Sequence, residues 1–185
     1  MAEIKSSLEI AMERAAAIGG GGHEEIDREE GDKRGKVAAR KLLTGELDTS
    51  ALSDEIRSLS GEGLSAARSA AAQILLEAVP QAPDRALAGL GALVDQGAGQ
   101  GDAGELVRRL AGVVMAIQEA DAALAGEVAR DMTRELAQAG ISGSAVTANP
   151  AAHPDYLERR KAALSDGFMQ YNNVARELAQ SLGLA

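Results

Sequence analysis

Residues 103–138 are AGELVRRLAGVVMAIQEADAALAGEVARDMTRELAQ, and apolar side chains recur along them at helical spacing. Steps of four and three residues alternate through Leu106, Leu110, Val113, Ile117, Ala120 and Leu124. This alternation is the heptad pattern of a helix that packs along one seam. From Leu124 to Leu136 every step is four, so the apolar stripe is expected to drift around the helix. The pattern predicts one long central helix of roughly 50 Å.

Shorter helices are predicted on the N-terminal side of this segment. Residues 52–59 form a short helix that ends at Gly61, and residues 64–78 form a longer one. Pro83 occupies the first turn of a third helix, where a missing N–H costs nothing. Since no segment alternates with a period of two, the sequence predicts an all-α, multi-helix bundle.

Four glycines are expected to divide the N-terminal part of the chain. Residues 1–18 have one narrow apolar face and are typical of an amphipathic helix. Gly19 to Gly22 should end that helix and act as a hinge, and a charged helical arm follows, so that hinge and arm cover residues 19–44. Residues 45–185 then form the helical bundle domain.

The arm is charged along its whole first half. Between Ile26 and Val37 it has no apolar residue, so this half is expected to be exposed. Its acidic and basic residues lie four apart in the order that stabilises a helix, as in Glu29 with Lys33. Gly31 and Gly35 should each cost about 1 kcal/mol relative to alanine.

The C-terminal part is predicted to contain two helices after a loop. Pro154 opens a helix that continues through Leu164 and stops at Gly167, and residues 168–182 form the last helix. Three- and four-residue steps alternate without a break through Phe168, Tyr171, Ala175, Leu178 and Leu182. We interpret these five residues as the candidate interaction face, which packs against the bundle or in the groove of a partner.

Composition excludes several classes of function. The net charge of −9 opposes binding to nucleic acid, whose affinity comes from Lys and Arg. With no cysteine, the chain has no disulfide, iron–sulfur cluster or thiol nucleophile. Its N-terminus is too charged for a signal peptide, and no apolar run approaches the roughly 18 residues of a membrane span. The composition favours a cytoplasmic protein.

The charged arm contains two patterns that superficially suggest a binding site. GDKRGKV, residues 31–37, resembles a nucleotide-binding loop, but three residues separate its glycines where that motif has four, and no Ser or Thr follows Lys36. His23, Glu24, Glu25 and Asp27 are possible metal ligands. Only His23 and Asp27 share a helix face, whereas a metal site needs three or four convergent ligands. No metal or cofactor is therefore expected.

The loop after Gly140 contains the ingredients of a hydrolytic triad, namely Ser142, Ser144, Thr147, His153 and Asp155. Ser142 lacks the second glycine of a nucleophile elbow, and no strand is predicted to present it. We therefore expect no catalytic residue in this loop.

The N-terminal string AEIKSSLEIAMERAAAI, residues 2–18, carries one family resemblance. It is similar to the EIKS-x-L-x-x-x-M-E-R opening of small uncharacterised cytoplasmic proteins from anaerobic, mostly deltaproteobacterial, species. The resemblance implies a bacterial, cytoplasmic protein, and it implies no activity and no site residues.

These features together favour a non-catalytic interaction or assembly module that binds a protein partner or itself. The alternative is a small-molecule-binding or enzymatic helical protein with a pocket between its alanine-rich helices.

Overall fold

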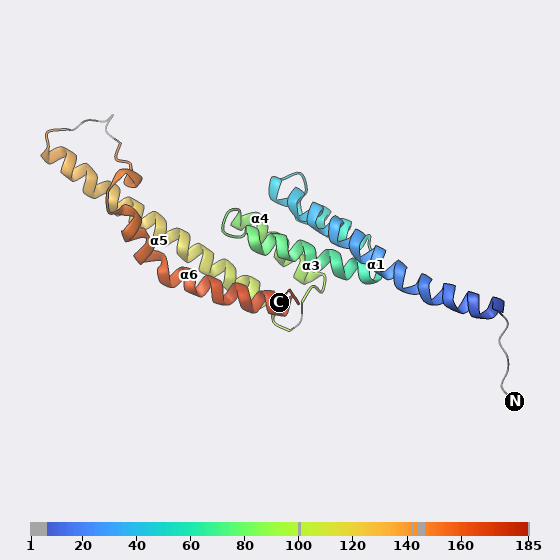
Figure 1. Cartoon of the computed structure of the whole chain (residues 1–185). Coiled ribbons are helices and arrows are strands. Elements are labelled where there is room, and N and C mark those ends of the chain that lie inside the picture. Colours follow the sequence, from blue (N-terminus) through green and yellow to red (C-terminus); the bar gives the residue numbers. More distant parts are fainter. Residues whose placement is uncertain (1–6, 100, 142, 144–146, 185) are drawn as a thin grey trace. The chain divides into compact units, whose positions relative to one another are not determined.

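The helices predicted from apolar spacing are present, although two of them are longer than expected. The computed structural model describes residues 7–99, 101–141, 143 and 147–184, with side chains described from residue 23 onward. The α-helices of this part of the chain are α1 Ser7–Thr44, α2 Thr49–Arg57, α3 Gly61–Ala78, α4 Pro83–Asp95, α5 Ala103–Gln138 and α6 Tyr156–Ser181 (Figure 1). A 3-10 turn, Pro150–Ala152, precedes α6, and no strand occurs among the described residues. The prediction of an all-α fold is confirmed.

The chain folds into two units. The first comprises residues 1–104 and 179–185, and the second comprises residues 105–178. The first unit therefore contains α1 to α4, and the second contains nearly all of α5 and α6. Residues 45–185, which were predicted to form one bundle domain, are shared between the two units.

In the first unit, α1 and α3 approach so closely that side chains would not fit between them. A Cβ added to Gly31 would overlap the backbone carbonyl of Gly63, and one added to Gly35 would overlap that of Ala67. Gly31 and Gly35 are both buried. The prediction of an exposed arm is thus wrong for one side of this helix, because small residues can bring two helix backbones together without any large apolar side chain.

The predicted ion pairs of α1 lie away from its contact with α3 or at the edge of that contact. Lys33 lies 3.5 Å from Glu29, and Lys36 lies 2.8 Å from Asp32. The Glu29 and Lys33 side chains are largely in solvent and those of Asp32 and Lys36 are partly exposed, so each pair contributes only a few tenths of a kcal/mol to the stability of the helix.

The predicted helix end at Gly19 to Gly22 is also wrong, because α1 continues through these residues without interruption. A glycine lowers helix propensity by about 1 kcal/mol but does not by itself end a helix. The helix ends instead at Thr44, where Gly45 adopts a φ of 85° and its N–H bonds to the carbonyl of Leu42. Positive φ at the residue after the last turn is the usual glycine termination signal.

The core of the first unit is aliphatic and alanine-rich. Its largest fully buried side chains come from α2, α3 and α4, together with the residue that follows α3, and are Leu52, Ile56, Leu75, Val79, Leu90 and Leu93. Asp48 caps α2 by accepting a 2.8 Å hydrogen bond from the N–H of Ala51. Pro83 stands in the first turn of α4, as predicted.

The second unit is an antiparallel pair of long helices. Arg109 near the start of α5 is 3.1 Å from Glu177 near the end of α6, and Glu127 further along α5 is 2.6 Å from Arg159 near the start of α6. The predicted break at Gly167 does not occur, since α6 runs from Tyr156 to Ser181 as one helix. A Cβ on Gly167 would come within 2.7 Å of Cγ1 of Ile117, so this glycine allows α6 to pack closely on α5.

The seam of α5 lies one residue away from several predicted positions. Val113 and Ala120 were expected in the seam, but Val114 is buried in place of Val113, and Ala120 is exposed. Steps of four and three instead connect Val107, Leu110, Val114, Ile117, Asp121, Leu124 and Val128. The true heptad includes an aspartate, which is why a search for apolar residues alone missed it.

Candidate docking groove on the C-terminal helix

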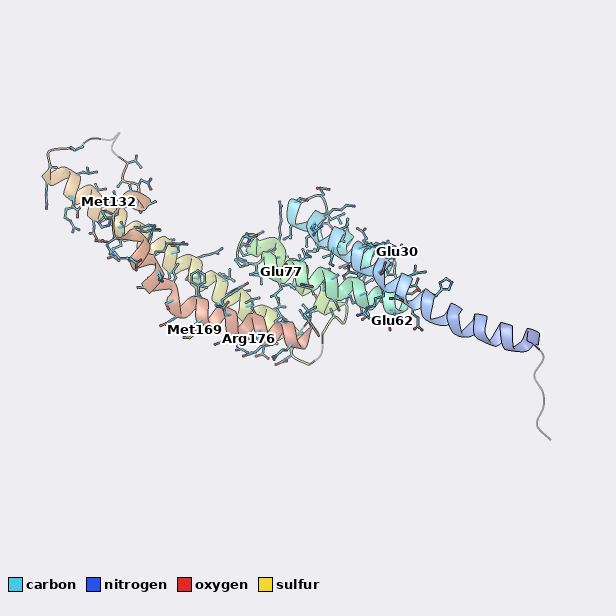
Figure 2. All side chains as sticks on the ribbon, viewed as in Figure 1. Glu30, Glu62, Glu77, Met132, Met169 and Arg176 are labelled. Carbon is cyan, nitrogen blue, oxygen red and sulfur yellow. The ribbon has the colours of Figure 1, made fainter. Side chains whose placement is uncertain are left out.

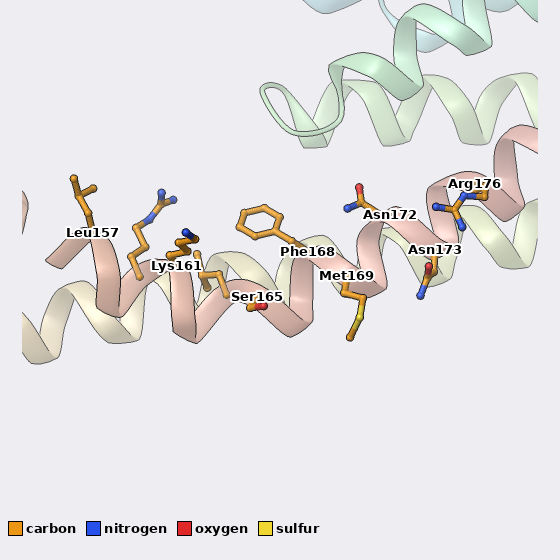
Figure 3. A pocket seen from close by; sticks show the side chains of 10 residues that line it. Leu157, Lys161, Ser165, Phe168, Met169, Asn172, Asn173 and Arg176 are labelled. Atoms are coloured by element: carbon orange, nitrogen blue, oxygen red, sulfur yellow. The ribbon is translucent and has the colours of Figure 1, made fainter. Parts of the chain in front are cut away.

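A shallow, open surface with a volume of about 630 Å³ runs along one side of α6. All of its lining residues belong to this helix and are Leu157, Arg160, Lys161, Leu164, Ser165, Phe168, Met169, Asn172, Asn173 and Arg176. Figure 3 shows how Leu157, Phe168 and Asn172 project from the same side of the helix. We call this surface the α6 groove.

Large apolar side chains in the α6 groove are exposed to solvent. Leu157 is 70% exposed, Met169 is 59% exposed and Phe168 is 45% exposed. Single apolar residues on a surface are ordinary, but three large exposed ones on a single helix suggest an interaction surface or an aggregation risk. Phe168 is the only phenylalanine of the chain, so its exposure leaves a large share of the aromatic surface outside the core.

The groove and the packed seam are different faces of one helix. The side of α6 that packs on α5 carries the buried residues Leu164, Val174 and Leu178. Successive residues of an α-helix turn by about 100°, so Phe168 lies roughly 80° around the axis from Leu178. Leu164 borders both faces, since it is buried and also lines the groove. The α6 groove is therefore on a different side of the helix from the contact with α5.

The ionisable residues that line the groove are all cationic. They are Arg160, Lys161 and Arg176, in a chain whose net charge is −9. Arg160 is already paired with Asp121 of α5. Lys161 and Arg176 form no ion pair with any residue whose side chain the structure describes. Figure 2 shows Arg176 and Met169 on the surface of α6. The groove thus combines exposed apolar side chains with two cations that have no ion-pair partner among the described side chains.

Arg160 is held in the wall of the groove by two hydrogen bonds to Asp121. Its Nε and one terminal nitrogen each donate to a different carboxylate oxygen at 2.7 Å. The hydrogen bond from Arg160 lowers the pKa of Asp121, which partial burial alone would raise. The same hydrogen bond raises the pKa of the Arg160 guanidinium above its usual value. This bidentate pair allows an aspartate to occupy a seam position.

The Asp121–Arg160 pair makes the stability of the second unit sensitive to acid. The pKa of Asp121 is lower in the folded chain than in the unfolded chain. The ionised carboxylate therefore stabilises the fold fully above the unfolded-state pKa of about 3.9, and this stabilisation is lost as the pH falls through the folded-state pKa. We therefore expect Asp121→Asn to melt below the parent at pH 7, with the gap closing toward pH 2. Melting curves recorded by circular dichroism across this range measure the gap. A gap that stays constant with pH would show that the carboxylate charge contributes nothing.

The predicted interaction face is divided between the two faces of α6. Leu178 and Leu182 are buried, Tyr171 and Ala175 are half-buried, and Phe168 is exposed in the groove. Burial raises the pKa of the Tyr171 phenol. Leu182 lies outside the second unit, and its Cδ2 would be 3.1 Å from a Cβ on Gly99.

The sequence did not predict several residues of the groove as part of an interaction surface. They are Leu157, Arg160, Lys161, Met169, Asn172 and Arg176. Leu157, Lys161, Phe168 and Asn172 are related by steps of four and seven residues, but the expected break at Gly167 hid this regularity.

The other sequence candidates do not form a convergent site in the structure. Ser142 and Ser144 lie outside the described residues, and the Nδ1 of His153 accepts a 3.2 Å hydrogen bond from the N–H of Asp155. His23 is exposed on α1. Within the described part of the chain, no three His, Cys, Asp or Glu residues come together as metal ligands. None of the described helices has the length and apolarity needed to cross a membrane.

A scan against protein-family models finds no match to this chain, and searches among curated proteins and solved structures find none either. The function is therefore inferred from the groove itself.

Proposed function

We propose that this chain is a non-catalytic interaction module that holds a protein partner in the α6 groove. The observation that supports this most strongly is the exposure of Leu157 and Phe168 on the same side of a helix that is already packed along another side (Figure 3). Aromatic and Met side chains are enriched at protein interfaces, whereas exposed apolar groups carry an aggregation cost if they remain uncovered. The cytoplasmic and bacterial setting implied by the N-terminal resemblance belongs to the same proposal.

A second candidate function is supported by a different surface. An open groove of about 870 Å³ in the first unit is lined by α1, α3 and residues 183–184, and it contains polar groups from both helices. Its size would admit a small molecule. However, its charged residues, such as Glu29 and Lys33, are mainly in solvent and pair with each other. None of the polar side chains that line this groove is buried, so none is held in place by surrounding protein for a ligand.

Site-specific photo-crosslinking in cells tests the interaction function. A photoreactive phenylalanine at Phe168 should produce one discrete crosslinked species, because this position lies in the groove. The same group at Gln170 is the matched control, since Gln170 is also exposed on α6 but does not line the groove. The adduct from position 168 should disappear when Leu157→Asp is added to the same chain.

Two results would contradict the proposal. One is the absence of any adduct from position 168, and the other is an identical adduct pattern from positions 168 and 170. Adducts that survive Leu157→Asp would show that contact is made by chance collisions and not by docking in the groove.

A further inference from the structure

The charges of the α6 groove narrow the chemistry of its occupant, if the groove is a docking surface as proposed above. Lys161 and Arg176 lie 15 positions apart on α6, or roughly 22 Å along the helix. Leu157 and Phe168 lie 11 positions apart, or roughly 16 Å. An occupant that covers all four residues must be extended along α6 for about five helical turns. A helix laid along the groove meets this requirement with its own apolar stripe.

The positive charges of the groove favour an occupant with acidic residues. No acidic side chain lines the groove, and Lys161 and Arg176 have no ion-pair partner among the described side chains. Carboxylates placed near these two cations would form ion pairs at the edge of an apolar contact, where water is partly excluded and the attraction is stronger than in open solvent.

A second copy of the same groove does not fit as the occupant. If two α6 helices paired antiparallel through their grooves, Lys161 of one would face Arg176 of the other, at both ends of the contact. A parallel pairing would place each cation against its own equivalent. Both arrangements bring like charges together, which disfavours the pairing.

An anionic membrane surface also fits poorly. The groove offers few exposed apolar side chains, chiefly Leu157, Phe168 and Met169, and only two cations without an ion-pair partner among the described side chains, which is little for binding to anionic lipid. The geometry points to one occupant: an amphipathic helix of a partner protein, with acidic residues flanking its apolar stripe at positions that match Lys161 and Arg176.

Fluorescence anisotropy with a designed peptide tests this inference on the full chain. The probe is a labelled 20-residue peptide of Ala and Gln, with four Leu at heptad spacing and two Glu at each end. Its comparison peptide has Lys in place of all four Glu. We expect the Glu peptide to bind roughly tenfold more tightly, since two partly exposed ion pairs replace two repulsions. Lys161→Glu combined with Arg176→Glu should reverse this preference, and both positions are on the surface of α6.

The controls separate this inference from the proposed function. Equal binding of the two peptides, or a preference that survives the double charge reversal, would overturn the acidic helix as occupant. If a crosslink from position 168 still forms in cells in that case, the groove docks a partner of other chemistry and only the inference fails. Binding of the chain to vesicles of equal anionic and zwitterionic lipid, lost in Leu157→Asp, would identify a membrane as the occupant and would also overturn the inference.

Discussion

Gly35→Ala is expected to lower the free energy of unfolding of the first unit by about 3 kcal/mol. The added methyl group would overlap the backbone carbonyl of Ala67 on α3. A flexible side chain could move aside, but here the neighbour is backbone inside a helix, so α1 and α3 must separate along their contact. Gly31→Ala should act in the same direction, since its methyl group would overlap the carbonyl of Gly63.

Gly91→Ala is the matched control for this prediction. Gly91 lies within α4 of the same unit, and a Cβ added there meets nothing within 4 Å. The substitution should raise stability by up to about 1 kcal/mol, because alanine has the higher helix propensity. Guanidinium denaturation followed by circular dichroism compares the two variants. If Gly35→Ala proved as stable as Gly91→Ala, the close α1–α3 contact would not exist in solution.

Leu178→Ala should cost about 2 to 5 kcal/mol, whereas Phe168→Ala should cost less than about 1 kcal/mol. Leu178 has no exposed surface and lies on the face of α6 that packs on α5, so its truncation leaves a cavity. Phe168 is 45% exposed, and much of its ring is in water in the folded chain. Equilibrium unfolding of both variants measures these costs.

Binding of the Glu peptide should be weakened most by the substitution that costs little stability, Phe168→Ala. Phe168→Ala removes the central apolar side chain of the α6 groove, so binding of the Glu peptide should weaken by about tenfold or more. A mild truncation on the packed face, Val174→Ala, serves as a control that lowers stability and leaves the groove unchanged. A Phe168→Ala variant that is as destabilised as Leu178→Ala would mean that the ring is part of the core, and the two-face description of α6 would be wrong.

The sequence predicted the helices well where apolar spacing and termination signals agree. The long helix over residues 103–138 has the bounds expected from its pattern, and Pro83 opens α4 as its position in the sequence indicates. Both features depend on local chemistry, namely regular burial along one helix and a missing N–H in a first turn.

Glycine caused the main errors in the predicted fold. Gly19 to Gly22 and Gly167 were interpreted as helix ends, but these residues lie inside α1 and α6. Whether a glycine ends a helix or allows a close contact depends on what lies opposite, and the partner of Gly167 is Ile117, 50 positions away. That partner cannot be identified from local spacing.

The candidate site was predicted only in part. Phe168 was placed on the interaction face and does line the groove, but it was grouped with Leu178, which is in the core. Similarly, Asp121 was not expected in the seam of α5, because its acceptability depends on two hydrogen bonds from Arg160 of α6. A residue whose environment is set by another helix cannot be assigned from its own helix alone.

Thiol accessibility along α6, measured both in cells and on the purified chain, tests most directly whether the groove is covered by a partner. The chain has no cysteine, so Phe168→Cys, Gln170→Cys and Val174→Cys each introduce a single reactive thiol. In the purified protein, alkylation should be fast at positions 168 and 170 and slow at position 174, which is buried. In cells, we expect position 168 to become protected while position 170 stays reactive. Equal reactivity of positions 168 and 170 in cells would contradict the proposed docking function, because it would show that no partner covers the α6 groove in cells.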